Sequence, residues 1–363
     1  MSNERRDRAA TSSDVAQLAG VSRSAVSRTF TAGASVAPDT RDRVLAAARA
    51  LKYRPNQIAR SLITNRSMLI ALAISHLDNQ FYPPVVERFV EAFAAIGYRV
   101  LLFITRGETS YEPLLDELLR YHVDGVVLAS SGSASLIAEC RAAGLPIILF
   151  NNAGLDDETP HVLGRNLEGA TTVAHFLLAG GHRRFAFLAG LPGVATSEQR
   201  GAAFARAITA ASHAPPVVVV GGYTYDVAYD ATTALLATAE PPDALFCAND
   251  HMALAALNSA VAAGRQPGRD LSIVGFDDVD IAGWPMLALT SYSQPMTTMV
   301  DTTVSMLDAL IRHTPLVRST YQIAGRLVVR GSARSPDTGI VTDADGTRIW
   351  QLPSGGTETM STP

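Results

Sequence analysis

The stretch SDVAQLAGVSRSAVSR, Ser13–Arg28, decides the fold of the N-terminal part of the chain. Its first half is typical of a short helix that ends at Gly20, because glycine readily takes the left-handed conformation found at helix ends. Ser22 then offers a hydroxyl N-cap to a second helix, and Val26 on that helix would pack back against the first. Two helices around so tight a turn are typical of a helix-turn-helix, whose second helix lies in the major groove of DNA.

The charged residues of this stretch favour a DNA-binding role. Arg23 and Ser24 open the second helix and Arg28 follows one turn later, where an arginine can donate two hydrogen bonds to guanine or clamp a phosphate. By themselves these residues also fit an ordinary pair of packed helices. However, residues 1–66 contain 12 basic and 5 acidic side chains, whereas the rest of the chain contains 18 basic and 29 acidic ones. A basic N-terminal part on an acidic body is the electrostatic pattern of a DNA-binding module joined to a domain of another kind.

A third helix and a short segment after it complete this part of the chain. Pro38 at the first helical position and Asp39 in the first turn predict a helix start, and apolar residues at helical spacing continue it to Leu51. A proline in Tyr53-Arg54-Pro55-Asn56 then breaks the chain before a segment of one or two turns with an exposed Leu62.

Taken together, these motifs resemble those of the lactose-repressor (LacI/GalR) family of bacterial transcription regulators. The resemblance rests on Asp14-Val15-Ala16, Ala19-Gly20-Val21-Ser22, Val26-Ser27-Arg28, Thr40-Arg41, Val44, Tyr53-Arg54-Pro55-Asn56 and Ala59-Arg60-Ser61-Leu62. It implies double-stranded operator DNA as a partner, with Leu62 as an apolar wedge in the minor groove. The DNA-contacting residues that it implies are Ser22, Arg23, Ser24, Ser27, Arg28, Asn56, Arg60 and Leu62. Because one helix-turn-helix reads only a half-site, a homodimer on a palindrome is the simplest assembly.

After Leu69 the sequence changes to short apolar runs that alternate with amphipathic helices. The runs are 69–74, 98–103, 125–128, 146–150, 185–188, 217–220, 244–247 and 273–276. Continuous apolar strands separated by helices indicate parallel sheets that are covered on both faces. There are too many strands for one small sheet, so two doubly wound subdomains are expected, with ligands bound outside the carboxyl ends of their strands.

The resemblance, which spans about residues 13–333, implies the layout of the periplasmic sugar-binding proteins for this body. Three crossovers between subdomains are then expected near Gly164–Asn166, Ser293–Pro295 and Gln322–Gly325. The predicted fold class is a small all-α helix-turn-helix headpiece followed by an α/β effector domain of two doubly wound parallel-sheet subdomains. The expected boundaries are 1–54 for the headpiece, 55–67 for a hinge helix and linker, and 68–334 for the body. Within the body, 68–164 and 296–322 form the N-subdomain, and 166–293 and 324–334 form the C-subdomain.

The last segment, 335–363, is rich in Ser, Gly, Thr, Asp and Pro and has no sustained apolar period. This composition predicts a disordered tail, with at most a short strand around Ile349 and Trp350. The tail contains no heptads of the kind that would add a tetramerising coiled coil.

Effector-binding candidates are polar or aromatic residues that follow the predicted strands, begin the next helix or, in the case of Gln294, lie at a crossover. Each occupies a position where the family places ligand contacts. They are Ser75, Phe81, Tyr82, Asn151, Thr196, Arg200, Tyr223, Asn249, Asp277 and Gln294. A fork donor, a carboxylate and flat aromatic faces suit a small polar effector such as a carbohydrate or sugar acid. Phe81 fits ordinary packing equally well, and Arg200 and Asp277 can also pair with each other. Asp250 is expected to cap a helix that starts at His251 rather than to bind a ligand.

Three positions depart from the family pattern. Arg165 stands where relatives commonly have an aspartate, which could alter the choice of effector or the closure of the cleft. Ala37 occupies a helix N-cap where serine is usual, and this should weaken the cap. No basic residue directly follows Leu62, since Ile63 stands there.

Composition argues against several other classes of protein. No run approaches the ~20 apolar residues that span a bilayer, and Met1–Thr11 does not resemble a secretory signal. Cys140 and Cys247 lack metal-ligand spacing and fit buried reduced thiols, so a cytoplasmic protein without metal or cofactor is expected. The alternatives are a sugar-binding protein or an enzyme on the same bilobed fold. The chain has no phosphate-binding glycine motif, and the serines of Ser130–Ser133 have no partner His or acid at a recognised spacing.

Overall fold

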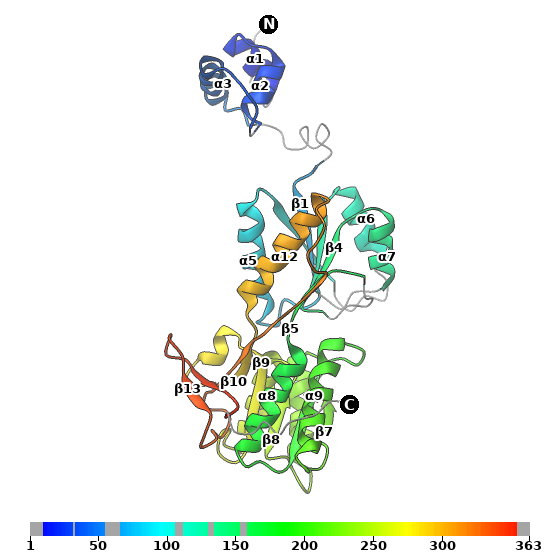
Figure 1. The fold of residues 1–363 in the computed structure, drawn as a ribbon, viewed down its shortest axis with the longest axis vertical. Coiled ribbons are helices and arrows are strands. Elements are labelled where there is room, and N and C mark those ends of the chain that lie inside the picture. Colours follow the sequence, from blue (N-terminus) through cyan, green and yellow to red (C-terminus); the bar gives the residue numbers. More distant parts are fainter. Residues whose placement is uncertain are drawn as a thin grey trace. The chain divides into compact units, whose positions relative to one another are not determined.

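The computed structural model describes residues 10–31, 33–54, 66–105, 112–129, 134–152 and 158–353 of the 363-residue chain. The chain forms two compact units, Met1–Ser67 and Met68–Pro363. The described part of the first unit contains three helices, α1 (Ser12–Ala19), α2 (Arg23–Thr29) and α3 (Pro38–Ala50) (Figure 1).

The turn between α1 and α2 has the predicted geometry. Gly20 adopts φ 65°, in the left-handed region, and ends α1. The Ser22 hydroxyl accepts a hydrogen bond from the Ala25 amide at 3.2 Å and so caps α2. Val15 of α1, Val26 of α2 and Val44 of α3 are fully buried in one small core. The helix-turn-helix predicted from the sequence is therefore present, with its recognition helix held against α1 and α3.

The second unit contains two sheets. The first has the strand order β11-β5-β4-β3-β1-β2, and all of its strands pair in parallel. Its strands are β1 (Leu69–Ile74), β2 (Arg99–Ile104), β3 (Gly125–Ala129), β4 (Ile147–Phe150), β5 (His161–Gly164) and β11 (Thr320–Ile323). Helices α5 (Tyr82–Ala95) and α12 (Met296–Ile311) lie on one side of this sheet, and α6 (Glu112–Arg120) and α7 (Ala134–Ala142) lie on the other (Figure 1).

Strand β1 shows why the sheet needs cover on both faces. Its residues alternate between the two layers: Ile70, Leu72 and Ile74 belong to the core that includes α5 and α12. Ala71 and Ala73 belong to the core formed with α6 and α7. Because side chains alternate across a strand, a strand buried on both faces reads as one continuous apolar run.

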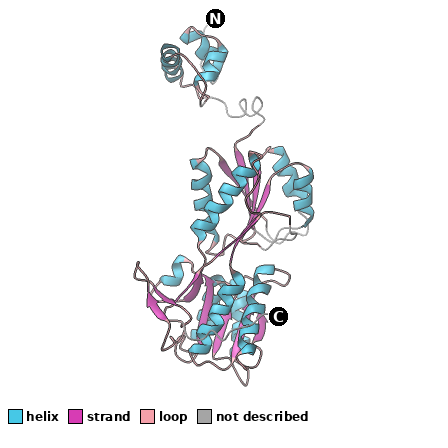
Figure 2. Cartoon of the chain, in the orientation of Figure 1, coloured by secondary structure: helices cyan, strands magenta, loops and turns pink. Residues whose placement is uncertain are grey.

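The second sheet has the strand order β13-β14-β12-β10-β9-β8-β6-β7. Its parallel strands are β6 (Phe185–Ala189), β7 (Val217–Val220), β8 (Ala244–Cys247), β9 (Ser272–Asp277) and β10 (Thr290–Ser293), and its antiparallel strands are β12 (Arg326–Val328), β13 (Ile340–Thr342) and β14 (Arg348–Trp350). The helices packed around it are α8 (Asn166–Ala179), α9 (Ala195–Ala210), α10 (Tyr225–Leu236) and α11 (Asp250–Ala262), with a 3-10 turn η1 (Asp280–Gly283) after β9 (Figure 2).

The chain passes between the two sheets at three segments, Gly164–Asn166, Ser293–Pro295 and Gln322–Gly325, which are the crossovers expected from the sequence. Gly164 ends β5 of the first sheet, and α8 then packs beside α9 and β12 in the C-subdomain. Ser293 ends β10 of the second sheet, and α12 packs on β4 and β5 of the first. The third passage joins β11 to β12. Each subdomain is therefore assembled from distant parts of the sequence.

The prediction of a disordered tail from residue 335 is wrong for residues 335–353. The predicted strand around Ile349 and Trp350 is present as β14, but it pairs on both sides, with β12 and with β13. Trp350 is buried, and its indole Nε1 donates to the Thr338 carbonyl at 3.1 Å. Its ring packs edge-on against Phe176 of α8, with the ring centroids 5.9 Å apart. A polar segment of this kind becomes ordered because a distant strand supplies its hydrogen bonds, which composition cannot reveal. Residues 354–363 lie outside the described residues.

Candidate functional site

The first candidate site is the exposed face of α2. The side chains of Ser22, Arg23, Ser24, Ser27 and Arg28 are all exposed there. The Ser22 and Ser24 hydroxyls lie 2.8 Å apart, and Arg28 Nε donates to the Ser24 carbonyl at 3.3 Å. The Ser22 hydroxyl already serves as the α2 cap, so its first role is structural. Asn56, Arg60 and Leu62, the other DNA-contact candidates, lie outside the described residues.

Two arginines of α3 donate hydrogen bonds to the ends of α1 and α2. Arg41 Nη1 donates to the Thr29 carbonyl at the end of α2 at 3.3 Å. Arg43 Nη1 donates to the Ala19 carbonyl at the end of α1, also at 3.3 Å. Both bonds satisfy carbonyl groups that a helix end leaves without an intrahelical partner. Part of the positive charge of the headpiece therefore also fixes the ends of the two helices.

The second candidate site is a pocket in the body, formed where strands of both sheets end. The empty space between its walls, counted together with the part that is open solvent, is about 650 Å³, and eight of the ten effector candidates line it. These eight are Ser75, Tyr82, Asn151, Thr196, Arg200, Tyr223, Asn249 and Asp277. Ser75 and Asn151 directly follow β1 and β4 of the first sheet, whereas Asn249 and Asp277 come from the ends of β8 and β9 of the second.

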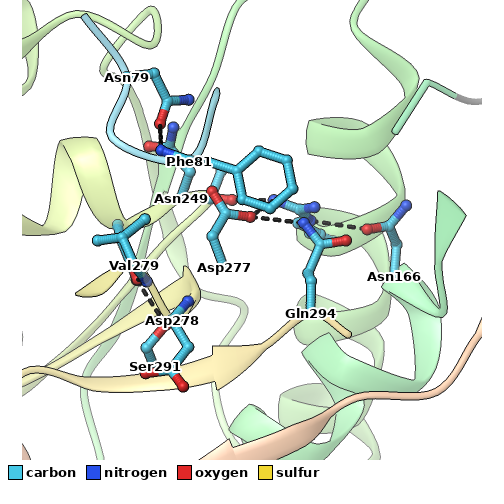
Figure 3. A network of polar contacts seen from close by, with 12 residues as sticks. Asn79, Phe81, Asn166, Asn249, Asp277, Asp278, Val279, Ser291 and Gln294 are labelled. Carbon is cyan, nitrogen blue, oxygen red and sulfur yellow. Dashed lines mark hydrogen bonds and ion pairs between the residues drawn. The ribbon is translucent and has the colours of Figure 1, made fainter. Parts of the chain in front are cut away.

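Arg200 and Asp277 both line the pocket and face each other, and Figure 3 labels Asp277 beside its partner Gln294. Arg200 Nη1 lies 3.8 Å from Asp277 Oδ1, and both side chains are almost fully buried. Arg200 Nε donates to Asn166 Oδ1 at 2.9 Å, and the guanidinium lies 3.7 Å from the centre of the Phe276 ring. Gln294 Nε2 donates to Asp277 Oδ1 at 2.7 Å. Each charge is thus paired and hydrogen-bonded, as burial requires.

Burial changes the acidity of the groups in this pocket. It raises the pKa of Asp277 to about 6, against the opposing effects of the Arg200 charge and the Gln294 hydrogen bond. Burial, helped by the charge of Asp277, also raises the pKa of Tyr82 far above its ordinary value. The pKa of Tyr223 is raised by burial as well. Both phenols are therefore neutral at physiological pH and can donate or accept hydrogen bonds.

Two amide atoms in the pocket have no hydrogen-bond partner among the residues that the structure describes. Asn249 Oδ1 accepts from the Met252 amide at 3.0 Å and caps α11, which leaves Asn249 Nδ2 buried without an acceptor. Asn151 Oδ1 is likewise buried without a donor. A buried polar atom without a hydrogen-bond partner is energetically unfavourable. Asn249 Nδ2 can therefore donate a hydrogen bond to a bound molecule, and Asn151 Oδ1 can accept one from it.

Phe81 and Gln294 do not line this pocket. They line a neighbouring one on the other side of Asp277, formed with the start of α12. Phe81 is buried and packs edge-on against Tyr82, with the ring centroids 5.4 Å apart. Its packing role, one of the two interpretations of the sequence, is therefore the one that the contacts support, and Gln294 acts on the pocket through Asp277.

The pocket also contains residues that the sequence analysis did not select. They are His76, Asn79, Ala129, Asn152, Leu191 and Val194. His76 and Asn152 each lie one residue beyond a selected position, so a wider window after each strand would have found them. Asn166, which holds Arg200, lies at the start of a helix after a crossover, and no strand-end rule points to it.

Two further expectations can be compared with the structure. The expectation that Asp250 caps a helix starting at His251 is wrong, because α11 begins at Asp250 and Asn249 is its cap. Burial, with the nearby charge of Asp277, raises the pKa of Asp250 to about 7.

Arg165 does not line the effector pocket. Its side chain pairs with Glu168 at 2.9 Å and donates to the Gln322 carbonyl at 3.4 Å, so it joins the first and third crossovers.

One buried cluster has the residue types of a hydrolase triad. The Ser272 hydroxyl lies 2.8 Å from His182 Nε2, and His182 Nδ1 lies 3.6 Å from Asp243 Oδ1. Ser272 and His182 are almost completely buried, and the Ser272 hydroxyl accepts a hydrogen bond from the Arg334 amide. A nucleophile needs access to its substrate, so this cluster is a structural tie between β9 and the end of α8. Ser130–Ser133 lie outside the described residues.

No cluster of three or more His, Cys, Asp or Glu side chains able to hold a metal ion occurs in the part of the chain that the structure describes. Within the same residues, no helix has both the length and the apolar character needed to cross a bilayer. Cys140 and Cys247 are buried free thiols, and burial raises the pKa of both.

Comparison with known proteins places both units. Residues 11–56 match the sequence model "Bacterial regulatory proteins, lacI family", and residues 174–333 match "Periplasmic binding protein-like domain". The ribose operon repressor of Halalkalibacterium halodurans is 30% identical over 322 residues, which cover 88% of this chain and 96% of that protein.

Two solved structures share the architecture. A lac repressor dimer bound to operator and an anti-inducer has a TM-score of 0.81 and 26% identity, covering 90% of this chain and all of that one. A complex of the regulator CelR with cellobiose has a TM-score of 0.69 and 30% identity, covering 89% of this chain and all of that one. With a helix-turn-helix headpiece and a periplasmic-binding-protein-like body, this chain belongs to the lacI family of bacterial regulatory proteins, which are DNA-binding transcription regulators and not enzymes.

Proposed function

We propose that this regulator is a cytoplasmic repressor of a catabolic operon, which binds a palindromic operator as a dimer and is controlled by a small uncharged carbohydrate. The observation that carries the proposal is the pocket between the two sheets, in which a buried Arg200–Asp277 pair lies beside buried amide atoms that lack partners. The names of two similar proteins support it: one is a ribose operon repressor, and the other is the regulator CelR, solved in complex with cellobiose.

The balance of charge in the pocket favours an uncharged effector over a sugar acid. Arg200 is a fork donor, but Asp277 already faces it at 3.8 Å. A carboxylate or phosphate bound there would compete with Asp277 for the guanidinium and would place two anions side by side. Sugar hydroxyls can instead donate to Asp277 and Asn151 Oδ1 and accept from Arg200 and Asn249 Nδ2, which matches the groups on both walls.

The effector would act by favouring one arrangement of the two subdomains. Gln80 in the N-subdomain already meets His251 in the C-subdomain, with 2.8 Å between Gln80 Oε1 and His251 Nδ1. A molecule that contacts both walls stabilises the closed arrangement, and only such a difference in affinity between states can switch DNA binding. The three crossovers would be the hinge of this motion.

Calorimetry on the purified full-length protein tests the pocket, with a panel of neutral mono- and disaccharides and the corresponding sugar acids. We expect a neutral sugar to bind, and we expect Arg200→Ala and Asp277→Ala to abolish that binding while operator binding in a gel shift persists. Arg206→Ala is the matched control, since Arg206 lies on the same helix but lines a different groove. Unchanged sugar binding in both pocket variants would place the effector site elsewhere, and preferred binding of sugar acids would overturn the assignment to an uncharged ligand.

A further inference from the structure

The backbone turn that carries Asp277 is conformationally unfavourable. Asp277 has φ 121° and Asp278 has φ 56°, so two consecutive residues with side chains lie in the region that favours glycine. Such strain persists only where the surroundings hold the backbone in place, and it is concentrated at functional sites. The turn directs the Asp277 carboxylate toward Arg200, so whatever holds the turn also sets the geometry of the pocket.

The hydrogen bonds of this turn converge on one carboxylate, that of Asp250 at the start of α11. Asp250 Oδ2 accepts from the Val279 amide at 2.9 Å. Asp250 Oδ1 accepts from the Ser291 hydroxyl at 2.6 Å, and the Ser291 hydroxyl itself accepts from the Asp278 amide at 3.0 Å. Of the two consecutive amides after Asp277, that of Val279 donates directly to Asp250, and that of Asp278 is linked to Asp250 through the Ser291 hydroxyl of β10. Figure 3 labels Asp278, Val279 and Ser291.

Asp250 is fully buried and does not line the effector pocket. A Cβ atom at position 275 would overlap Asp250 Oδ1, so glycine at that point of β9 leaves the space that the carboxylate occupies. From the other side, Arg330 Nη1 pairs with Asp278 Oδ1 at 2.7 Å. Burying a carboxylate without a paired cation is energetically unfavourable. Here the hydrogen bonds that link it to the two turn amides offset part of that penalty.

We infer that Asp250 is a positioning residue of the effector site: it fixes the strained turn 277–279 so that Asp277 faces Arg200, without itself touching the effector. The inference rests on the proposed function for the part that concerns effector affinity. It also makes a claim that needs no effector, namely that the amides of residues 278 and 279 are protected by Asp250.

Hydrogen exchange of the effector-free full-length protein tests that claim. In Asp250→Asn, an amide group replaces one acceptor oxygen, so we expect the amides of residues 278 and 279 to exchange at least about tenfold faster than in the wild type. Ser291→Ala should accelerate exchange of the residue 278 amide, because that amide donates to the Ser291 hydroxyl. Exchange of the residue 279 amide should stay near its wild-type rate. Asp226→Asn, an exposed aspartate in the first turn of α10, is the matched control and should change neither rate. Unchanged exchange in both test variants overturns the inference, and Ser291→Ala carries the test if Asp250→Asn does not fold.

Calorimetry with cellobiose and D-ribose as probes tests the effect on the site. We expect Asp250→Asn to weaken probe binding about tenfold or more, and to add nothing in an Asp277→Ala background, because Asp250 acts through Asp277. If the losses of probe affinity in the two single variants add up in the double variant, Asp250 acts independently of Asp277, and the positioning role is overturned. If the wild type binds neither these sugars nor others, the proposed carbohydrate effector fails, while the exchange measurement still decides the role of Asp250.

Discussion

At the scale of single residues, the pocket depends on charges that are buried together. Arg200 and Asp277 are each almost fully buried, and each also has an uncharged partner, Asn166 for the former and Gln294 for the latter. Removing one member of a buried pair leaves an uncompensated charge, which costs more than the pair contributes. The single variants Arg200→Ala and Asp277→Ala should therefore loosen the empty pocket as well as remove a ligand contact.

Effector affinity should fall as the pH is lowered from about 8 to 5. Ionised Asp277 accepts hydrogen bonds from sugar hydroxyls more strongly than the protonated acid does. Burial raises the pKa of Asp277 to about 6 and that of Asp250 to about 7. Because the bound state favours the ionised form, protons compete with the effector, and the loss can reach about tenfold per pH unit for each proton taken up. Calorimetry across this range measures the slope, which should be shallower in Asp277→Asn. A pH-independent affinity would contradict an ionised Asp277 in the complex.

Arg23 at the start of α2 should read a base rather than only the DNA backbone. We expect Arg23→Ala to cost about 1–3 kcal/mol of binding free energy at one base pair of each half-site, because a bidentate contact to guanine is lost. Gel shifts with operators carrying single substitutions measure this. An equal loss of affinity for every sequence would show instead that Arg23 clamps a phosphate.

At the scale of elements, the headpiece helices differ in how they begin. Thr11 and Asp14 form a complete capping box at α1, and Ser22 caps α2. At the start of α3, the N-cap residue is Ala37, whose side chain cannot accept a hydrogen bond from a backbone amide of the first turn. The weakness expected from the sequence is therefore present, and Pro38 and Asp39 are what remain to favour this helix start.

Ala37→Ser should stabilise the headpiece by about 0.5–1 kcal/mol, since a hydroxyl at this position can accept from an amide of the first turn. Hydrogen exchange of the α3 amides in the full-length protein measures the opening free energy of the headpiece. Ala50→Ser at the last residue of α3 is the matched control and should give no gain. An equal effect of both substitutions would mean that capping does not limit this helix.

Leu62→Ser tests the hinge at residues 55–67, which stays a prediction because residues 55–65 lie outside the described part of the chain. We expect specific operator binding and DNA bending to be lost while effector affinity is unchanged, because an apolar wedge is needed to open a base step. Bending can be followed by circular-permutation gel shifts. Retained bending in this variant would refute the wedge.

At the scale of the whole molecule, the body depends on pairing between distant segments. The C-terminal strands β13 and β14 extend the second sheet through β12, which itself follows the third crossover. Trp350 joins this extension to α8 through Phe176. The segment that composition predicts to be disordered is thus part of the sheet, and its Trp350 ring packs against α8.

Trp350→Ala should lower the free energy of unfolding of the body by about 3–5 kcal/mol, the usual cost of truncating a buried large aromatic side chain. Urea unfolding followed by far-ultraviolet circular dichroism measures it. Leu352→Ala, at a half-exposed position two residues later, should change stability by less than about 0.5 kcal/mol. A similarly small effect of Trp350→Ala would mean that residues 340–350 do not pack as described.

The sequence by itself predicted the helix-turn-helix, every strand that forms a continuous apolar run, and the polar residues that follow those strands. These features depend on local chemistry: Gly20 at a helix end, Ser22 at a cap, and apolar runs such as Leu69–Ile74 that are buried on both faces. Strands such as β10, with the sequence TSYS, were missed because their burial comes from neighbours in the sheet and not from their own side chains.

Only the tertiary structure decided which strand-end residues meet in one pocket and which merely support it. Phe81, at the start of a helix, and Gln294, at a crossover, were selected together with Asn151 and Asn249, yet they lie on the far side of Asp277. The roles of Asn166 and Asp250, and the order of residues 335–353, depend on contacts between segments far apart in the chain. Local patterns specify secondary structure because they act within one or two turns, whereas these contacts exist only once the two sheets have formed.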